Sequence, residues 1–259
     1  MNWQYVAAAS EAALRAGEIQ RARYGQQIEV EHKGTINLVT EVDRQCEAII
    51  VAALRERFPK HDLITEETRP SRTGSRFVWF VDPLDGTTNF AHGYPCFAVS
   101  IALTIDGETV AGVVYDALRG DLFTAERGAG AFRNGRRLRV SNAPELIESL
   151  LITGFPYDIH QETAAKLRRF SGMMSRARAI RRDGAAALDL CYVAAGQADG
   201  FWEDRLEPWD MLAANLMVEE AGGRVSRYDG TPVGLEPDEI AASNGLLHTK
   251  LLAALRLEE

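Results

Sequence analysis

The stretch VDPLDGTTNF, residues 81–90, places two carboxylates three positions apart, with Pro83 and Leu84 between them. The apolar run RFVWF precedes it and indicates a buried strand. Two like charges at the end of a buried strand repel each other and lose hydration, so they are costly unless a cation joins them. Asp82 and Asp85 therefore predict a cation site.

Three further acids share this signature of an acid at the end of an apolar element: Asp43 in LVTEVD, Glu66 in LITEE and Asp210 in EPWDM. Magnesium prefers hard oxygen ligands in an octahedral shell and usually keeps several waters. Because Pro83 stiffens the turn and has no N–H to satisfy, the carbonyl of Leu84 can turn toward the same ion. The pattern predicts a magnesium site in which divalent cations offset the repulsion.

The residues that follow predict an anion site beside the metal. Gly86 permits a sharp backbone and the close approach of an anion. The N–H groups of Gly86 and Thr87 would then point at whatever the metal holds.

Each piece also has an ordinary structural explanation. Asp, Pro and Gly are common turn residues, so segment 82–86 taken alone is equally well explained by a surface turn. Asp210, just behind Pro208, could complement the dipole of a helix. The pair Glu66-Glu67 taken alone is typical of solvated acids. Only the combination favours a metal site.

The first half of the chain is predicted to hold two helices and mostly antiparallel strands. Apolar residues at helical spacing indicate helices over 4–24 and 41–57. The pairs Asp106-Gly107 and Asn134-Gly135 are typical of hairpin turns. The expected strands are IEVEHK, INLVT, DLITEE, RFVWFVD, CFAVSIALTI, TVAGVVYDA, DLFTAE and AFRNGRRLRV.

Beyond a joint at NAPEL the pattern becomes more mixed. The expected helices are 161–175, GAAALDLCYVAAG, PWDMLAANLMVEEAGG and a terminal one, and the expected strands are SLLITGF, DGFWE, GRVSRYDG and EIAASN. We therefore expect an α/β fold with an antiparallel-rich first half and a smaller α/β second half, packed as layers around a shared cleft. The chain is predicted to be one domain, 1–259, with sub-domains of about 1–143 and 144–259.

The composition argues against several classes of protein. The 259 residues carry a net charge of −8, and the best basic cluster, RARAIRR at 176–182, is short, so nucleic-acid binding is not expected. No stretch approaches the ~18 apolar residues of a membrane span. The N-terminus has the spacing of an amphipathic helix and not of a signal peptide, so a cytoplasmic protein is expected. Cys46, Cys96 and Cys191 lie far apart and are expected to be reduced, mostly buried thiols.

Two long motifs resemble those of one enzyme family. VWFVDPLDGTTNFAHGYPCFAVSIAL and EPWDMLAANLMVEEAGGRV are similar to the two signatures of the inositol monophosphatase family, which belongs to the Mg-dependent, lithium-sensitive phosphatases. INLVTEVD, LITEE and AALDLCYVAAGQADGFWE extend the resemblance over nearly the whole chain. It implies a layered αβαβα sandwich, commonly a homodimer, that hydrolyses a phosphate monoester such as inositol 1-phosphate with two or three Mg²⁺.

The resemblance also implies roles for residues. The implied metal ligands are Glu66, Asp82, the Leu84 carbonyl, Asp85 and Asp210. The implied catalytic residues are Asp43, Glu66 and Thr87, and among them Thr87, paired with Asp43, positions and activates the attacking water. The implied substrate contacts are Asp85, Gly86, Thr87, Gly184, Ala185, Ala186 and Glu203, and Lys33 corresponds to a lysine near the metal loop. Metal-activated water requires no histidine base, so His92 is expected to pack or lie at the surface.

Two positions depart from the family pattern. Asn37 stands where many relatives carry Asp before LVT, which changes a charge near the metal loop. In the segment 183–187, DGAAA, a hydroxyl is missing and Asp183 adds a carboxylate near the substrate pocket. We expect Asp183 to cap the following helix. The alternative is that it changes which hydroxyls, or which second phosphate, the pocket accepts.

The substrate stays open among several phosphate monoesters. Inositol phosphate is favoured, and the alternatives are those of a fructose-1,6-bisphosphatase, a histidinol-phosphatase or a 3′-nucleotidase. A second phosphate would need a basic group, for which Arg181, Arg182 and Arg205 are the candidates. A different class is a regulatory protein that binds a macromolecule on the same fold. The complete metal set argues against a dead enzyme, because idle carboxylates would only repel each other.

Overall fold

The computed structural model describes residues 3–32, 38–68, 73–156, 163–235 and 239–256. Lys33 and Asn37, singled out from the sequence, lie outside the described residues. No helix within these ranges is both long and apolar enough to cross a membrane.

The first half forms a helical layer on a seven-stranded sheet. The helices are α1 (Trp3–Arg23) and α2 (Glu41–Arg57), and the strands β1 (Val30–His32) and β2 (Leu38–Thr40) form a separate antiparallel pair. In order across the sheet, the strands are β3 (Asp62–Thr65), β4 (Phe77–Asp85), β5 (Ala98–Ile105), β6 (Glu108–Asp116), β7 (Asp121–Glu126), β8 (Gly130–Arg133) and β9 (Arg136–Arg137). All neighbours are antiparallel except β3 and β4, which run parallel.

The second half forms a five-stranded sheet between two pairs of helices. In order across the sheet, the strands are β11 (Ala179–Arg181), β10 (Leu150–Thr153), β12 (Gly200–Asp204), β14 (Glu239–Ser243) and β13 (Arg224–Ser226). Strand β10 runs parallel to β11 and β12, and the other pairs are antiparallel. The helices are α4 (Thr163–Met174), α5 (Ala186–Ala194), α6 (Pro208–Glu220) and α7 (His248–Leu255), and a 3₁₀ turn, Leu146–Glu148, precedes β10.

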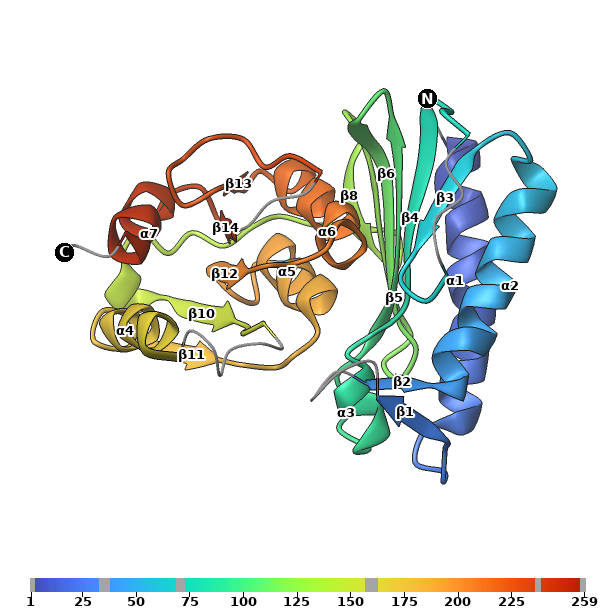
Figure 1. Cartoon of the computed structure of the whole chain (residues 1–259). Coiled ribbons are helices and arrows are strands. Elements are labelled where there is room, and N and C mark those ends of the chain that lie inside the picture. The colour runs from blue at the N-terminus through green and yellow to red at the C-terminus, as the bar shows by residue number, and fades with distance from the viewer. Residues whose placement is uncertain (1–2, 33–37, 69–72, 157–162, 236–238, 257–259) are drawn as a thin grey trace.

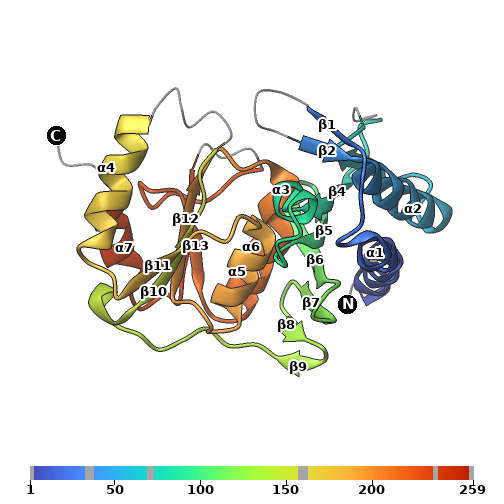
Figure 2. The same cartoon turned by 90° about the horizontal axis from the view of Figure 1, so that it is seen from below.

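Five layers alternate along one direction of the molecule. Helices α1 and α2 cover the outer face of the large sheet, α5 and α6 lie between the sheets, and α4 and α7 cover the outer face of the small sheet (Figure 1). The view from below shows α1 and α2 at one end and α4 and α7 at the other (Figure 2). The expected αβαβα sandwich is confirmed.

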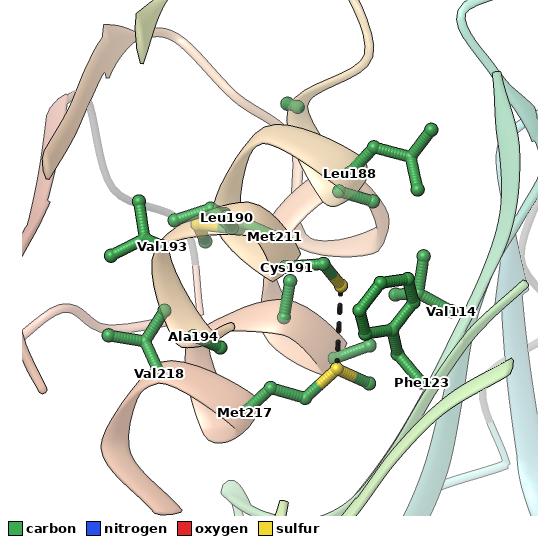
Figure 3. Close-up of a cluster of buried hydrophobic side chains, with 14 of the residues drawn as sticks. Val114, Phe123, Leu188, Leu190, Cys191, Val193, Ala194, Met211, Met217 and Val218 are labelled. Carbon is green, nitrogen blue, oxygen red and sulfur yellow. Dashed lines mark hydrogen bonds between the residues drawn. The ribbon is translucent and has the colours of Figure 1, made fainter. Parts of the chain in front are cut away.

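The middle layer carries the core that joins the two sheets. Phe123 of the large sheet packs with Leu188 and Cys191 of α5 and with Met217 of α6, and the Cys191 thiol lies 3.5 Å from the Met217 sulfur (Figure 3). Small residues such as Ala213 and Ala214 let α6 approach the sheet closely. All three cysteines are free and buried, as expected from their spacing.

Local signals explain the start of α2 and two hairpin turns. Thr40 is in extended backbone, its hydroxyl accepts from the amides of Val42 and Asp43, and the Asp43 carboxylate accepts from the Thr40 amide. Such a capping box fixes the start of α2, and its cap is typically worth ~1 kcal/mol. The hairpin turns at 106–107 and 134–135 are confirmed, since all four residues adopt positive φ.

Two differences from the sequence prediction bear on the site. Strand β3 ends at Thr65, so Glu66 lies just beyond the strand instead of within it. A short helix, α3 (Thr87–Ala91), was not predicted and directly follows the paired aspartates.

Candidate functional site

A bulge in β4 aims the two aspartates the same way. Asp82 pairs with Ser100 and Asp85 with Ala98, so three steps along β4 match two along β5. Residues three apart on a regular strand point to opposite faces, and the extra bulge residue resets this alternation. Both carboxylates therefore lie on the sheet face that looks toward α5 and α6.

Asp85 accepts hydrogen bonds from the N-terminus of α5. The amide of Ala187 donates to it at 2.8 Å, and the amides of Ala186 and Leu188 also lower its pKa. Burial acts in the opposite direction and is the larger cause, so the pKa of Asp85 rises to about 7. The expectation that Asp183 caps this helix is wrong: the cap residue is Ala185, which makes no side-chain cap bond.

Asp82 lies close to three other acids of the site. Its pKa is raised well above the usual value, first by burial and then by repulsion from Glu66, Asp85 and Asp210. One oxygen accepts from the amide of Leu84 at 2.8 Å, which holds the turn around Pro83. The acids thus act on one another electrostatically, as the sequence predicted.

Helix α6 brings Asp210 to the same place. Pro208 is its first residue, and Asp210 accepts from the amide of Glu207 at 2.8 Å, so Asp210 also serves as part of a capping box. The Ser100 hydroxyl donates to the carbonyl of Trp209 at 2.8 Å and ties the start of α6 to β5. Burial, then repulsion from Asp85, raises the pKa of Asp210 well above its usual value.

Thr87 and Asp43 form a hydrogen-bonded pair beneath the bulge. The Thr87 hydroxyl lies 2.9 Å from an Asp43 oxygen and 3.0 Å from the carbonyl of Leu84. Asp43 is fully buried, and burial raises its pKa against the hydrogen bonds from Thr40 that lower it. The capping box of α2 therefore fixes a buried carboxylate against the first residue of α3.

Gly86 makes the connection between β4 and α3 possible. Its φ of 93° lies in the left-handed region, and a Cβ there would lie 2.8 Å from the carbonyl oxygen of Cys96. Asn89, which sequence reasoning did not single out, donates from its amide to the carbonyls of Cys96 and Asp183, each at 2.8 Å. It thereby ties α3 to the segment that leads into α5.

Glu203 comes from the small sheet. Burial raises its pKa to about 8, while the guanidinium of Arg182 acts to lower it. Gly154 makes room for this carboxylate, because a Cβ at that position would lie 2.1 Å from its oxygens. A glycine at position 154 is thus required by the position of the Glu203 carboxylate, a signal that the sequence analysis did not use.

These residues line one cleft of about 570 Å³ between the two halves of the chain. The predicted site residues that line it are Glu66, Asp82, Leu84, Asp85, Gly86, Thr87, Gly184, Ala186, Glu203 and Asp210. Asp43 and Ala185 lie behind the wall and do not line it. Arg182 and Arg205 also line the cleft, whereas Arg181 lines a different pocket. The lining residues that sequence reasoning missed are Thr88, Asn89, Phe155, Pro156, Asp204, Leu206, Glu207 and Trp209.

His92 ends the short helix and is exposed. Its Nδ1 lies 2.8 Å from the carbonyl of Thr88. This places His92 at the surface, as expected, and outside the lining of the cleft.

The donor types in the cleft fit magnesium. They are carboxylate and carbonyl oxygens, which this ion prefers. As placed, no three acidic, histidine or cysteine side chains of the described ranges form a group that could hold an ion by themselves. Magnesium sites do not need such a group, because the ion is often held by one or two carboxylates and keeps its remaining waters.

A family model described as the inositol monophosphatase family matches residues 2–259. The chain belongs to this family. It is 43% identical over 249 residues to an inositol-1-monophosphatase of Synechocystis sp., covering 95% of this chain and 87% of that protein. It is also 43% identical over 250 residues to the Nus factor SuhB of Escherichia coli K12, covering 95% and 94%. The crystal structure of the extragenic suppressor protein SuhB from Bartonella henselae, 42% identical, matches with a TM-score of 0.95 over 99% of this chain and 100% of that one.

Membership of the inositol monophosphatase family identifies the chain as a phosphatase, a hydrolase of phosphoric monoesters. The family generally depends on Mg²⁺, in agreement with the oxygen donors of the cleft.

Proposed function

We propose that this protein hydrolyses inositol monophosphate to inositol and inorganic phosphate with Mg²⁺ and an activated water. One observation above all supports the proposal: acids from β4, α6 and the end of β3 line the same cleft as Gly86 and Thr87. Oxygen donors for a cation beside amide donors for an anion suit metal-assisted hydrolysis of a phosphate ester. Relatives named inositol-1-monophosphatase suggest inositol as the alcohol.

The acids of the cleft would hold two or three ions. The proposed ligands are Glu66, Asp82, the carbonyl of Leu84, Asp85 and Asp210. Bound Mg²⁺ would neutralise the phosphate charge and lower the pKa of a coordinated water.

Thr87 and Asp43 would receive the proton of the attacking water. If the Thr87 hydroxyl donates to Asp43, at 2.9 Å, its oxygen keeps lone pairs that can accept from a water in the cleft. As the water attacks phosphorus, its proton would pass to the Thr87 oxygen, and the hydroxyl proton would move on to Asp43. Burial raises the pKa of Asp43, which makes its carboxylate a better proton acceptor.

Backbone amides and two carboxylates would bind the substrate. The amides of Gly86 and Thr87, at the start of α3, would hold phosphate oxygens. Asp85, Glu203 and the amide of Ala186 would meet the hydroxyls of the alcohol, with Gly184 and Ala185 forming the adjacent wall.

A phosphate-release screen tests the substrate. We expect inositol 1-phosphate to show the highest kcat/KM among inositol, fructose, histidinol and nucleotide 3′-phosphates, with Mg²⁺ required. Asp85→Asn serves as the inactive control. Because Arg182 and Arg205 line the cleft, fructose 1,6-bisphosphate is the sharpest competitor. A kcat/KM about tenfold higher for another substrate would replace inositol phosphate in the proposal.

A second role, as a factor that binds a macromolecule, is suggested by relatives named Nus factor SuhB. An Asp85→Asn variant separates the two roles, because a binding role would survive the loss of hydrolysis in cells. The resemblance also leads us to propose a homodimer, for which a mass near twice 28.6 kDa by light scattering is expected.

A further inference from the structure

Glu47 is a buried carboxylate whose two oxygens both accept hydrogen bonds from the loop that follows β3, residues 66–68. It lies on α2 with 4% of its surface exposed. One oxygen accepts from the amide of Glu67 at 2.9 Å, and the other accepts from the hydroxyl of Thr68. The first residue of this loop is Glu66, which lines the cleft.

The loop is fixed on both sides of Glu66. On the strand side, the amide of Glu66 donates to the carbonyl of Val81 at 3.2 Å and prolongs the pairing of β3 with β4. On the far side, the loop is held by Glu47, which accepts hydrogen bonds from the Glu67 amide and the Thr68 hydroxyl. Strand β3 ends at Thr65, and residues 66–68 belong to no strand. In this segment the carboxylate of Glu47, instead of a strand partner, accepts the hydrogen bonds from Glu67 and Thr68.

Helix α2 thus contacts two different parts of the site with one face. Asp43 and Glu47 are four residues apart, so their side chains lie one above the other. Asp43 contacts Thr87 at the start of α3, and Glu47 contacts the loop after β3. The helix therefore sets the spacing between Thr87, proposed to take the proton of the attacking water, and Glu66, a proposed Mg²⁺ ligand.

We propose that Glu47 is a positioning residue that holds Glu66 in place as a Mg²⁺ ligand. The inference rests on the proposed ligand role of Glu66. A carboxylate suits the task because each of its oxygens can accept, whereas glutamine offers only one acceptor oxygen. Mutation of residues that orient metal ligands typically lowers metal affinity by about 10- to 100-fold.

Glu220 provides a matched control. It lies on α6, and its two oxygens accept from the amides of Gly128 at 2.7 Å and Gly130 at 2.8 Å. It anchors the turn between β7 and β8 and does not line the cleft. Glu47→Ala and Glu220→Ala thus remove the same kind of anchor at two places, and Glu47→Gln removes one of the two acceptor oxygens at the first.

The main measurement is calorimetric Mg²⁺ titration of the substrate-free protein. We expect Glu47→Ala to weaken the tightest Mg²⁺ binding by about tenfold, with a smaller loss in Glu47→Gln and none in Glu220→Ala. Hydrogen exchange of the Glu67 amide is expected to speed up in Glu47→Ala. In activity assays, the Mg²⁺ concentration for half-maximal rate rises, while kcat at saturating Mg²⁺ and KM for substrate stay within about threefold.

Two further variants keep the outcome decisive. Thr68→Val removes one hydrogen-bond donor to Glu47 and leaves Glu47 in place. We expect it to weaken Mg²⁺ binding less than Glu47→Ala does. If Glu47→Ala does not fold, Thr68→Val tests the positioning role in its place. Glu66→Gln tests the ligand role itself. If Glu66→Gln weakens Mg²⁺ binding but the Glu47 and Thr68 variants bind normally, the positioning role is wrong. If Glu66→Gln also binds normally, the proposed ligand role of Glu66 is wrong.

Discussion

At the scale of single residues, the cleft is governed by the charge of buried carboxylates. Burial is the largest cause of the raised pKa of Asp82, Asp85, Glu203 and Asp210, and the acids add repulsion to it. A set of acids that opposes its own ionisation destabilises the fold unless cations compensate. Removing the charge of one of these acids should therefore raise the stability of the metal-free protein and lower its activity.

Asp82→Asn is expected to show this opposition. Asparagine keeps an oxygen that can accept from the Leu84 amide, at present a 2.8 Å bond, and removes the charge that repels Glu66 and Asp85. In EDTA the variant should gain on the order of 1–2 kcal/mol in free energy of unfolding. With saturating Mg²⁺ its phosphate release should fall by about 10³-fold. A variant that is less stable than wild type in EDTA would contradict the account.

Thr87 can be tested with two near-isosteric changes. Thr87→Val removes the hydroxyl that contacts Asp43 and Leu84, and we expect kcat to fall by about 10²-fold with little change in KM. Thr87→Ser keeps the hydroxyl and should retain activity within about tenfold. Steady-state phosphate release measures both. Equal kcat values for the two variants would exclude a role for the hydroxyl in proton transfer.

At the scale of elements, the turn from β4 into α3 is tightly constrained at Gly86. Gly86 combines a left-handed φ of 93° with a backbone oxygen 2.8 Å from where a Cβ would lie. Gly86→Ala should therefore cost about 2 kcal/mol or more of unfolding free energy in urea. It should also weaken inhibition by inorganic phosphate, because the amides of α3 shift. Gly93→Ala is the control, since Gly93 has a φ of 69° with open space around it.

The elements that the sequence predicted correctly depend on local signals. The helix over 41–57 follows from apolar spacing and the Thr40 cap, and the turns at 106–107 and 134–135 follow from their residue types. Glu66, Asp82, Asp85 and Asp210 were found because each of them ends an apolar element, whereas Asp204 and Glu207, which also line the cleft, were missed. The convergence of Glu66, Asp82, Asp85 and Asp210 on one cleft agrees with that pattern.

The elements that it missed depend on contacts between distant residues. Helix α3 has only five residues, too few to show a periodic pattern, and its first residue, Thr87, is held by Asp43, which lies 44 positions away in the sequence. Asp183 has the residue type of a cap, but the start of α5 donates its hydrogen bond, from the amide of Ala187, to the carboxylate of Asp85, which is distant in the sequence. A bulge that turns two aspartates to one face likewise exists only once β4 and β5 are paired.

At the scale of the whole molecule, we expect a histidine in the outer helical layer, remote from the cleft, to make the stability of the fold sensitive to acid. His248 of α7 is fully buried between Ser226 and Ser243, with each ring nitrogen 2.8 Å from a hydroxyl. Burial, and then the charge of Arg224, lowers its pKa to about 4 from the ordinary 6.5. At this group the folded protein therefore binds fewer protons than the unfolded chain, so His248 contributes a loss of stability as pH drops from 6.5 to 4. The cleft acids with raised pKa contribute in the opposite direction, so the contribution of His248 is measured by comparison with a variant that lacks it.

Urea unfolding across this pH range measures the effect. His248 should account for a loss of about 2–3 kcal/mol between pH 6.5 and pH 4, since each pKa unit is worth about 1.4 kcal/mol. His248→Gln should be less stable at pH 8, where the packed ring is lost, yet show a shallower decline toward pH 4. Parallel pH profiles for the two proteins would rule out this histidine as a source of the acid sensitivity.

The middle layer bears on whether the chain unfolds as one domain. We propose that the sub-domains of about 1–143 and 144–259 form a single cooperative unit. Phe123 of the large sheet and Phe201 of the small sheet belong to one core cluster, and residues of α5 and α6, which lie between the sheets, make up much of that cluster. Neither half can open without exposing this shared apolar surface, which costs about 25 cal/mol per Å².

Native-state hydrogen exchange tests this cooperative unit. The slowest amides of β5 and of β12 should exchange with the same free energy, and Met217→Ala, in the shared layer, should lower both equally by about 2–5 kcal/mol. Leu251→Ala, in the outer cluster with α7, is the comparison: in one cooperative unit it lowers both values as well, whereas independent halves would lose protection in β12 alone. Loss confined to β12 would divide the molecule into two separately folding parts that meet at the cleft.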